Sequence, residues 1–243
     1  VLHTGATPVM VDISPDDFNI SNEKIAAAIT ERTKVIMPVD ISGYPCDYDA
    51  IYQIVEANRA IFQASNEKQE KLGRILIAAD AAHSFGATYK GKVSGAIADV
   101  TCFSFHAVKN LTTAEGGAIC FNLPAGFDHE EIYKEFCIKI LHGQSKDALA
   151  KAQKGAWRYD VVEPGFKCNM TDLQAAIGLV QLDRLKEFQE SRRKIVDLYA
   201  SSLGALDGIA LPVERANVES ALHLYPIRLN LNELTIDRNR FIE

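Results

Sequence analysis

Short apolar runs alternate along this chain with segments of helical periodicity. Arg74–Ala79 (RILIAA) shows no alternation of apolar and polar residues, which is typical of a strand covered on both faces. From Asp47 onward, Ile51, Ile54 and Val55 fall on one side of a helix. Strands that alternate with helices favour a mostly parallel sheet with helices packed against it. The sequence therefore predicts an α/β fold.

The same patterns predict the other elements of the chain. A helix is expected after Ser21, which is a favourable N-cap residue, and should run through Ile25 and Ile29. The polar window Gln63–Lys71 is expected to be an exposed helix end or a surface insertion. Further strands are expected at Pro8–Asp12, Lys34–Val39, Val100–Phe105, Ala118–Phe121 and, as an edge strand because it contains a proline, Leu222–Leu229. Further helices are expected at Glu130–Leu141 and at Thr171–Leu203, the second of which could be broken in two.

Composition excludes several classes of protein. The 26 basic and 32 acidic residues give a net charge of −6, so nucleic acid is not expected as the main partner, because phosphate binding needs a basic face. No window approaches the roughly 18 apolar residues that a membrane span needs. The length of 243 residues fits one large domain, or one domain and part of another.

Cysteine and histidine spacing predicts neither a disulfide framework nor a metal site. The five cysteines contain no C-x-x-C pair, and the six histidines show no metal-ligand spacing. Cys102 and Cys120 lie within apolar runs, so core thiols in a reducing compartment are the favoured interpretation.

Candidate chemical groups follow the ends of the predicted strands, where ligands bind in open parallel sheets. Asp80 comes directly after one strand, and Ser104 lies near the end of the next with Lys109 five residues later. Asp80 alone could be a helix cap, and Lys109 alone could be a solvated surface lysine. Lys109, however, stands between a buried strand and a turn in a region with few charges. That context can desolvate an amine and depress its pKa, as a Schiff-base lysine requires.

A near match to a phosphate-binding loop is discounted. Gly86–Lys92 (GATYKGK) has most of the P-loop pattern, but Val93 stands where a magnesium-binding hydroxyl is needed. The segment Tyr89–Lys92 instead indicates a tight turn between two extended pieces.

Taken together, three motifs resemble the DegT/DnrJ/EryC1/StrS aminotransferases, which bind pyridoxal 5'-phosphate (PLP) on the type I aminotransferase fold. These motifs are Asp80–Ala87 (DAAHSFGA), Phe103–Asn110 (FSFHAVKN) and Glu115–Gly117 (EGG). Other segments that resemble the family follow in the right order, so that the resemblance covers essentially the whole chain: Gly5–Asp12, Thr33–Val39 and Gly165–Gly178.

The resemblance implies a role for each matching residue. Lys109 would hold PLP through a covalent imine and would later move the substrate proton. Asp80 would face the pyridine nitrogen and keep it protonated. Ala82 would pack its methyl group on the ring, His83 would lie near the phenolic oxygen, and Ser104 would donate its hydroxyl to the phosphate.

Two positions depart from the family pattern. Lys167 stands where many members have an asparagine that reaches the phosphate of the neighbouring subunit, and Asn169 stands where an arginine is common. A lysine can still hold a phosphate as a point charge. Both residues are therefore weaker cofactor-binding candidates, in an expected homodimer.

The resemblance also implies the reaction and the domain organisation. An amino group would pass from an amino acid, glutamate in most of the family, to a keto group of a nucleotide-linked sugar, in the cytoplasm. Residues 1–200 would form part of the PLP-binding large domain and residues 201–243 the start of a small C-terminal domain. The resemblance implies a family segment before Val1 and a part after Glu243 that would complete the small domain, and both are expected to be missing from this chain. An incomplete, non-catalytic fragment is therefore one alternative.

Another PLP-dependent activity, such as dehydration, is a further alternative. In relatives that are dehydratases the lysine is replaced by histidine. The presence of Lys109 favours transamination.

Overall fold

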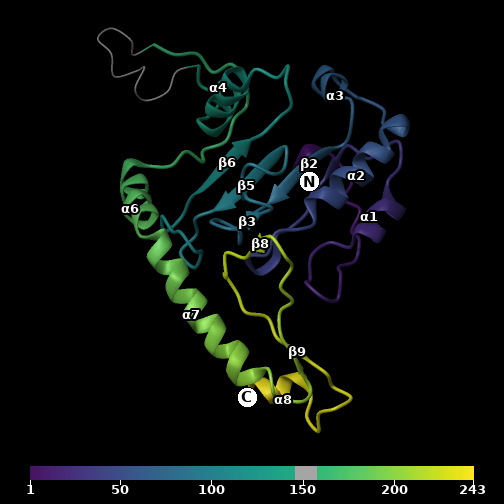
Figure 1. Ribbon diagram of the computed structural model, residues 1–243. Helices are drawn as coiled ribbons and strands as arrows, with labels where there is room; N and C mark the ends of the chain where they lie inside the picture. Colours follow the sequence, from purple (N-terminus) through teal and green to yellow (C-terminus); the bar gives the residue numbers. More distant parts are fainter. Residues whose placement is uncertain (146–157) are drawn as a thin grey trace.

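The computed structural model describes residues 1–145 and 158–243 (Figure 1). Its central sheet has the strand order β1–β2–β5–β6. These strands are Val35–Ile36, Leu76–Asp80, Val100–Ser104 and Gly117–Phe121, respectively. The first three are parallel, and β6 is antiparallel to β5. The expected α/β fold with a mostly parallel sheet is confirmed.

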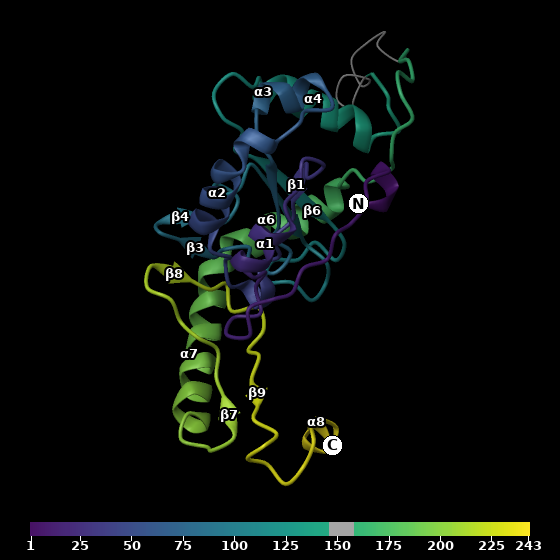
Figure 2. The same ribbon diagram turned by 90° about the vertical axis from the view of Figure 1, so that its right-hand side faces the viewer.

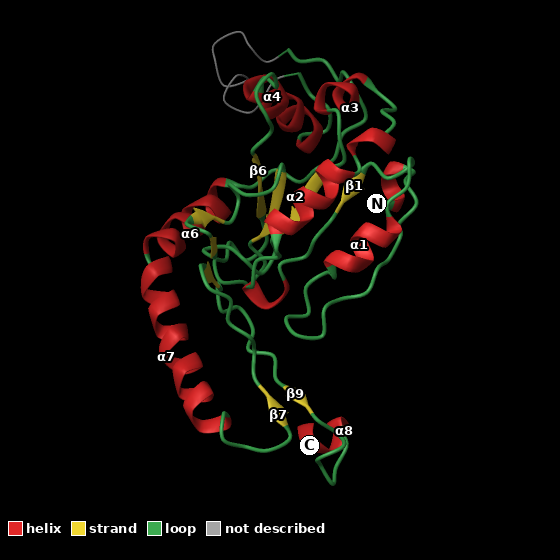
Figure 3. Ribbon diagram, turned by 45° about the vertical axis from the view of Figure 1, so that its right-hand side comes forward, coloured by secondary structure: helices red, strands yellow, loops and turns green. Residues whose placement is uncertain are grey.

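Helices α1 (Asn22–Ala28) and α2 (Tyr48–Ala57) cover one face of the sheet, as Figure 3 shows for α2. The side chains of Ser21 and Asp47 cap them, each accepting a hydrogen bond from a backbone N–H of the first turn. Buried apolar side chains of the two helices pack against buried side chains of β1 and β2, which are Ile25, Ile51, Val55, Ile36, Ile77 and Ala79. This cluster holds the sheet in place beneath the strand ends.

Two further pairs of helices lie around the sheet. Helices α3 (Glu67–Leu72) and α4 (His129–Ile140) lie together beyond the strands, so the polar window at 63–71 is a short exposed helix rather than an extension of α2. Helices α6 (Asp172–Asp183) and α7 (Leu185–Leu203) form the second pair. A capping box at Thr171 starts α6, and the predicted break is confirmed at Arg184.

The C-terminal part of the chain extends away from the sheet. Figures 1 and 2 show α7 running from the sheet to a small unit with β7 (Ile209–Ala210), β9 (Arg228–Leu229) and α8 (Arg238–Ile242). Strand β8 (Val218–Glu219) instead returns to pair with β3 (Thr88–Tyr89). One-turn 3-10 helices occur at Leu2–Thr4, Ile41–Gly43 and Arg59–Ile61.

The hairpin of β3 and β4 (Lys92–Val93) agrees with the rejection of a P-loop. Its turn residues Lys90 and Gly91 both have positive φ, and no helix follows it. The strand–turn–strand geometry differs from the strand–loop–helix geometry that a P-loop requires.

Three predicted strands are wrong or much shorter. Of Lys34–Val39, only Val35–Ile36 forms a strand, and Val39 makes an isolated bridge to Asp80, because Pro38 has no N–H to donate between them. Pro8–Asp12 forms no strand: Val9 and Met10 are 70% and 89% exposed, and Pro8 has no N–H to donate to a sheet. Of Leu222–Leu229, only the last two residues form a strand. Leu222 has a φ of 54°, outside the range of a strand, and the residues after it bond to the Ser42–Gly43 turn instead.

The interpretation of both apolar-run cysteines as core thiols is also wrong in part. Cys102 is exposed, because side chains alternate along β5 and Thr101 and Phe103 occupy its inward positions. Cys120 of β6 pairs with Thr101 and packs against the core at Phe103, but it is only half-buried. The thoroughly buried thiol is Cys46, before α2. Within the two described ranges, no helix is long and apolar enough to cross a membrane, and no cluster of three potential metal ligands occurs.

Candidate active site

Asp80 and Ser104 are the last residues of the neighbouring parallel strands β2 and β5. Register pairs Asp80 with Cys102, so the two side chains lie at the same edge of the sheet. The Asp80 carboxylate accepts a hydrogen bond from the Ala82 N–H at 3.1 Å. A turn follows instead of a helix, so the helix-cap alternative does not describe Asp80.

The loop after β5 carries Lys109 back toward this edge. The Ser104 hydroxyl accepts a hydrogen bond from the His106 N–H at 3.3 Å, and the Lys109 N–H donates to the His106 carbonyl at 2.9 Å. The Phe105 N–H donates to the Gly116 carbonyl at 2.8 Å, which closes the loop against β6. Lys109 is half-buried, unlike a freely solvated surface lysine.

The pKa of His83 depends on both Asp80 and Lys109. Burial is the main cause that lowers the pKa of His83, the positive charge of Lys109 lowers it further, and the negative charge of Asp80 opposes both. The charges of Asp80 and Lys109 therefore act on the His83 ring in opposite directions. The Ser42 N–H donates to Nδ1 of His83 at 3.3 Å, which orients the ring. The structure thus places Asp80 and Ser104 at one edge of the sheet with Lys109 in the following loop, as the strand pattern predicts, and His83 follows Asp80 in the turn after β2.

His223 joins this group from the C-terminal part of the chain. Its ring centroid lies 4.4 Å from that of His83, and its Nδ1 lies 2.9 Å from Oδ1 of Asn110, the residue after Lys109. Burial chiefly, then the charges of His83, Lys109 and Arg192, lower the pKa of His223 to about 4. Sequence spacing gave no signal for His223, because it belongs to no local motif and its neighbours in space come from other elements.

A glycine makes this approach of distant segments feasible. Gly43 has a φ of 92°, and a Cβ there would meet the His83 carbonyl oxygen at 2.9 Å and the Ala221 Cβ at 3.1 Å. The Gly43 carbonyl accepts from the Ala221 N–H at 2.8 Å, and the Ser42 carbonyl accepts from the His223 N–H at 3.0 Å. The turn after β1 is therefore pressed between the His83 turn and the His223 segment.

Lys167 and Asn169 lie apart from this cluster in the single chain. The Lys167 ammonium donates to Oδ1 of Asn169, and the Lys167 backbone bridges to Leu141 after α4. Within the described residues, neither has a hydrogen bond or ion pair with Asp80 or Lys109. Their predicted contact with a cofactor of a neighbouring subunit stays a prediction.

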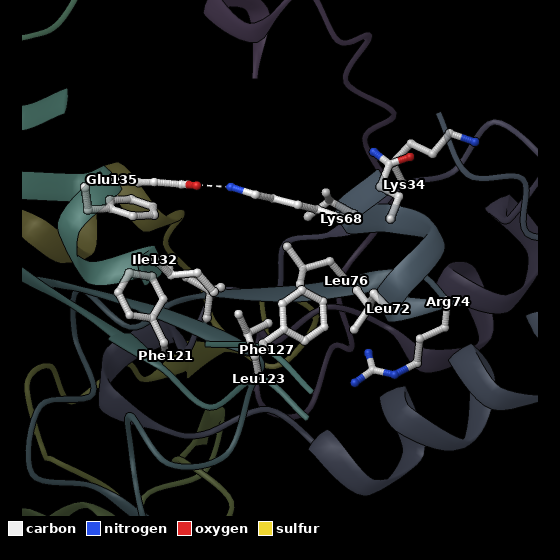
Figure 4. A pocket seen from close by; sticks show the side chains of 14 residues that line it. Lys34, Lys68, Leu72, Arg74, Leu76, Phe121, Leu123, Phe127, Ile132 and Glu135 are labelled. Carbon is white, nitrogen blue, oxygen red and sulfur yellow. Dashed lines mark hydrogen bonds and ion pairs between the residues drawn. The ribbon is translucent and has the colours of Figure 1, made fainter. Parts of the chain in front are cut away.

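An apolar cavity of about 250 Å3 lies at the opposite end of the sheet (Figure 4). Val35, Leu76 and Val100, which are the first residues of β1, β2 and β5, line it together with side chains of α3 and α4. An ion pair between Lys68 and Glu135 crosses it. It contains none of the predicted site residues, so the polar edge at Asp80 and Ser104 is the candidate active site.

The donor set at that edge fits PLP. Asp80 supplies a carboxylate for a ring nitrogen, Ser104 a hydroxyl for a phosphate and Lys109 an amine for a carbonyl carbon. His83 and His223 add two imidazoles whose pKa values are lowered.

Known proteins resemble this chain along its whole length. The profile of the DegT/DnrJ/EryC1/StrS aminotransferase family matches residues 1–243. The Methanocaldococcus jannaschii protein MJ1066 is 40% identical over 244 residues, covering 100% of this chain and 58% of its own length. The Bacillus subtilis spore coat polysaccharide biosynthesis protein SpsC is 37% identical, covering 100% of this chain and 57% of its own.

Solved structures of sugar aminotransferases resemble the fold closely. The proposed sugar aminotransferase Spr1654 from Streptococcus pneumoniae, in its PMP form, matches with a TM-score of 0.88 and 52% identity, over 94% of this chain and 57% of that one. Its PLP form matches with a TM-score of 0.87 and 49% identity, over 94% and 56%. The chain thus spans less than three fifths of the length of these relatives.

Proposed function

The chain belongs to the DegT/DnrJ/EryC1/StrS aminotransferase family, and on this premise we propose that it holds PLP on Lys109 and transfers an amino group to a sugar. The amino donor is an amino acid, with glutamate the first candidate, and the acceptor is a keto group of a nucleotide-linked sugar. The observation that carries the proposal is the position of Asp80 and Ser104 at the carboxyl ends of adjacent parallel strands, with Lys109 in the loop that follows Ser104. The relative from spore coat polysaccharide biosynthesis supports a sugar substrate.

Each residue has a distinct task in this proposal. PLP, when bound, supplies an electron sink for the reaction. Asp80 keeps a proton on the ring nitrogen, and Ser104 donates its hydroxyl to the phosphate. Ala82 packs its methyl group against the ring. Lys109 accepts and returns the proton at the substrate Cα.

His83 acts as a neutral hydrogen-bond donor in this arrangement. The Ser42 N–H occupies Nδ1, so that nitrogen is an acceptor and the ring proton resides on Nε2. Burial lowers the pKa of His83, which favours the neutral ring. Nε2–H is then available to the phenolic oxygen of the cofactor.

The proposal also includes a homodimer of this chain. Lys167 and Asn169, exposed and half-buried respectively, are available to a second copy of the chain. We place them at the phosphate of the neighbouring subunit in a homodimer. Residues 1–200 then belong to the cofactor domain and 201–243 begin the small domain, in an enzyme that draws on cytoplasmic nucleotide-linked sugars.

The test is covalent capture of the cofactor. Purified protein mixed with PLP should absorb visible light, and borohydride should fix the cofactor to the peptide that contains Lys109. Lys109→Ala should lose both signals, whereas Lys92→Ala, which changes an exposed lysine of β4, should keep them. A visible band and a labelled peptide that persist in Lys109→Ala would overturn the assignment.

Product analysis tests the reaction itself. With glutamate and a nucleotide-linked keto sugar, transamination yields an amino sugar and 2-oxoglutarate in equal amounts. A deoxygenated sugar without 2-oxoglutarate would indicate dehydration instead.

A further inference from the structure

Asn110 and His223 lie beside Lys109 but have no task in the chemistry described above. They are 113 positions apart in the sequence, and their side chains are joined by a 2.9 Å hydrogen bond. Asn110 is 4% exposed, and its side-chain amide also donates to the Ala221 carbonyl. One buried amide therefore ties the Lys109 loop to the C-terminal segment.

We propose that Asn110 and His223 form a positioning pair: Asn110 fixes His223 as a neutral imidazole with its proton on Nδ1, and the pair holds the Lys109 loop in place. The catalytic part of this inference rests on the proposed role of Lys109. The tautomer does not, because it follows from hydrogen bonding alone.

The hydrogen-bond partners determine the tautomer in two steps. The Ala221 carbonyl can only accept, so it fixes the NH2 end of the Asn110 amide and turns Oδ1 toward His223. An amide oxygen also can only accept, so Nδ1 of His223 must carry the proton. Nε2, on the opposite edge of the ring, is then an unprotonated acceptor.

His83 has the opposite tautomer. A backbone N–H can only donate, so the Ser42 N–H makes Nδ1 of His83 the acceptor and leaves the proton on Nε2. The two rings, with centroids 4.4 Å apart, thus offer one donor at Nε2 of His83 and one acceptor at Nε2 of His223. A pair of this kind offers complementary hydrogen bonds without adding a charge.

The surroundings keep His223 neutral. Burial is the first cause that lowers its pKa, and the other causes are His83, Lys109 and Arg192 of α7. Among the residues that the structure describes, no carboxylate raises the pKa of His223. Protonation would also bring a cation next to other positive groups, which a half-buried site disfavours.

The bond between Asn110 and His223 also restrains the loop that carries Lys109. The Ala221 and His223 N–H groups donate to the turn carbonyls of Gly43 and Ser42, so the segment that holds Asn110 is itself held against the sheet. Removing the bond between Asn110 and His223 leaves Asn110, the residue next to Lys109, tied to the C-terminal segment only through the Ala221 carbonyl. A displacement of about 1 Å at a reacting group can lower a rate about 100-fold.

The first experiment reads the tautomers directly. In cofactor-free protein labelled with 15N-histidine, NMR couplings between ring nitrogens and ring protons should show His223 protonated on Nδ1 and His83 on Nε2. His223→Gln and His83→Gln assign the signals, and His129→Gln, which changes an exposed histidine of α4, should leave both unchanged. A wild-type His223 protonated on Nε2 would overturn the proposal.

A near-isosteric substitution of Asn110 tests whether this residue determines the tautomer and the titration of His223. Asn110→Asp keeps an acceptor at Nδ1 and adds a negative charge, so it should keep the Nδ1–H tautomer and raise the titration midpoint of His223 by about 1 to 3 pH units. An unchanged midpoint in folded Asn110→Asp protein would contradict the pairing. The wild-type spectrum decides the tautomer even where this variant folds poorly.

The positioning role is tested by two substitutions of His223 that differ in one hydrogen bond. His223→Phe keeps a ring but cannot donate to Asn110, so kcat should fall about 10- to 100-fold with little change in KM for the amino donor. His223→Asn keeps an N–H near the position of Nδ1, so it should recover much of that loss. Equal kcat values in the two variants would overturn the role.

The two sets of results separate this inference from the proposed function. If the tautomers are as stated but Lys109 takes up no PLP, the proposed function fails and the paired geometry stands. If Lys109 holds PLP but His223 is protonated on Nε2, the positioning pair fails and the proposed function stands.

Discussion

Arg74 and Asp99 form a buried ion pair at the amino ends of β2 and β5, and replacing Arg74 with methionine tests how much the stability of the fold depends on it. The two side chains are 9% and 2% exposed. Two guanidinium nitrogens of Arg74 donate to the two oxygens of Asp99, both at 2.7 Å. Asp99 also accepts from the Ile77 N–H at 2.9 Å and from the Tyr52 hydroxyl at 3.3 Å. The pair therefore joins the strands whose far ends carry Asp80 and Ser104.

The expected loss of stability follows from the burial of both partners. Removing one member of a buried pair leaves the other charge uncompensated, at a cost of about 3 to 5 kcal/mol. For a chain of this size, 1 kcal/mol shifts Tm by about 2 to 4 °C, so Arg74→Met should lower Tm by about 6 to 20 °C. The double variant Arg74→Met/Asp99→Asn should lose less than Arg74→Met alone, because the asparagine removes the charge and keeps an acceptor for the Ile77 N–H.

Urea unfolding of the two single variants, the double variant and a control measures these differences. Arg184→Met is the matched control, because its ion pair with Glu187 is 52% and 63% exposed and solvent screens it, so this change should affect stability little. The reasoning is refuted if Arg74→Met loses no more free energy of unfolding than Arg184→Met, or if the double variant loses the sum of its two single changes.

Three further predictions concern the site and its supports. Ser104→Ala should weaken PLP binding roughly 10- to 100-fold in a fluorescence titration, because a hydrogen bond to a charged group is worth about 1.5 to 3 kcal/mol; unchanged affinity would place the phosphate elsewhere. Gly117→Val should lower the free energy of unfolding by about 1 to 3 kcal/mol, because its Cβ would lie 2.5 Å from the Phe103 carbonyl oxygen, and a chemical denaturation curve that overlays the wild type would contradict this. Since the folded-state pKa of His223 is about 4 against 6.5 in its ordinary state, the unfolded chain binds more protons between these values. Stability should therefore fall as pH is lowered from 6.5 to 4, less steeply in His223→Gln, and equal slopes would refute this contribution.

Local patterns in the sequence were enough to predict the elements that surround the site. The apolar run before Asp80 and the run that contains Ser104 form adjacent parallel strands, and the caps at Ser21 and Asp47 begin helices as predicted. These elements depend on side-chain periodicity and on capping, which are properties of a few neighbouring residues. The same patterns placed Lys109 in the loop after β5.

The exposure of individual side chains in the sheet could not be predicted from these local patterns. Cys102 lies in an apolar run but is exposed, whereas Cys46, outside any strand, is buried. An apolar run predicts a strand without showing which of its two faces is covered, since that depends on the elements packed against each face. The exposed segment at 8–12 has the composition of a strand but no partner strand among the described residues.

The sequence by itself determined the α/β pattern, the family resemblance and the set of Asp80, Ser104 and Lys109, because these depend on local periodicity and on residues close together in the chain. Only the tertiary structure added His223, since contact between residues 113 positions apart depends on how α7 and the segment after it return to the sheet. Tautomers and pKa shifts belong to the same class: Asn110, Ser42 and Arg192 determine them through space, by hydrogen bonding, burial and charge.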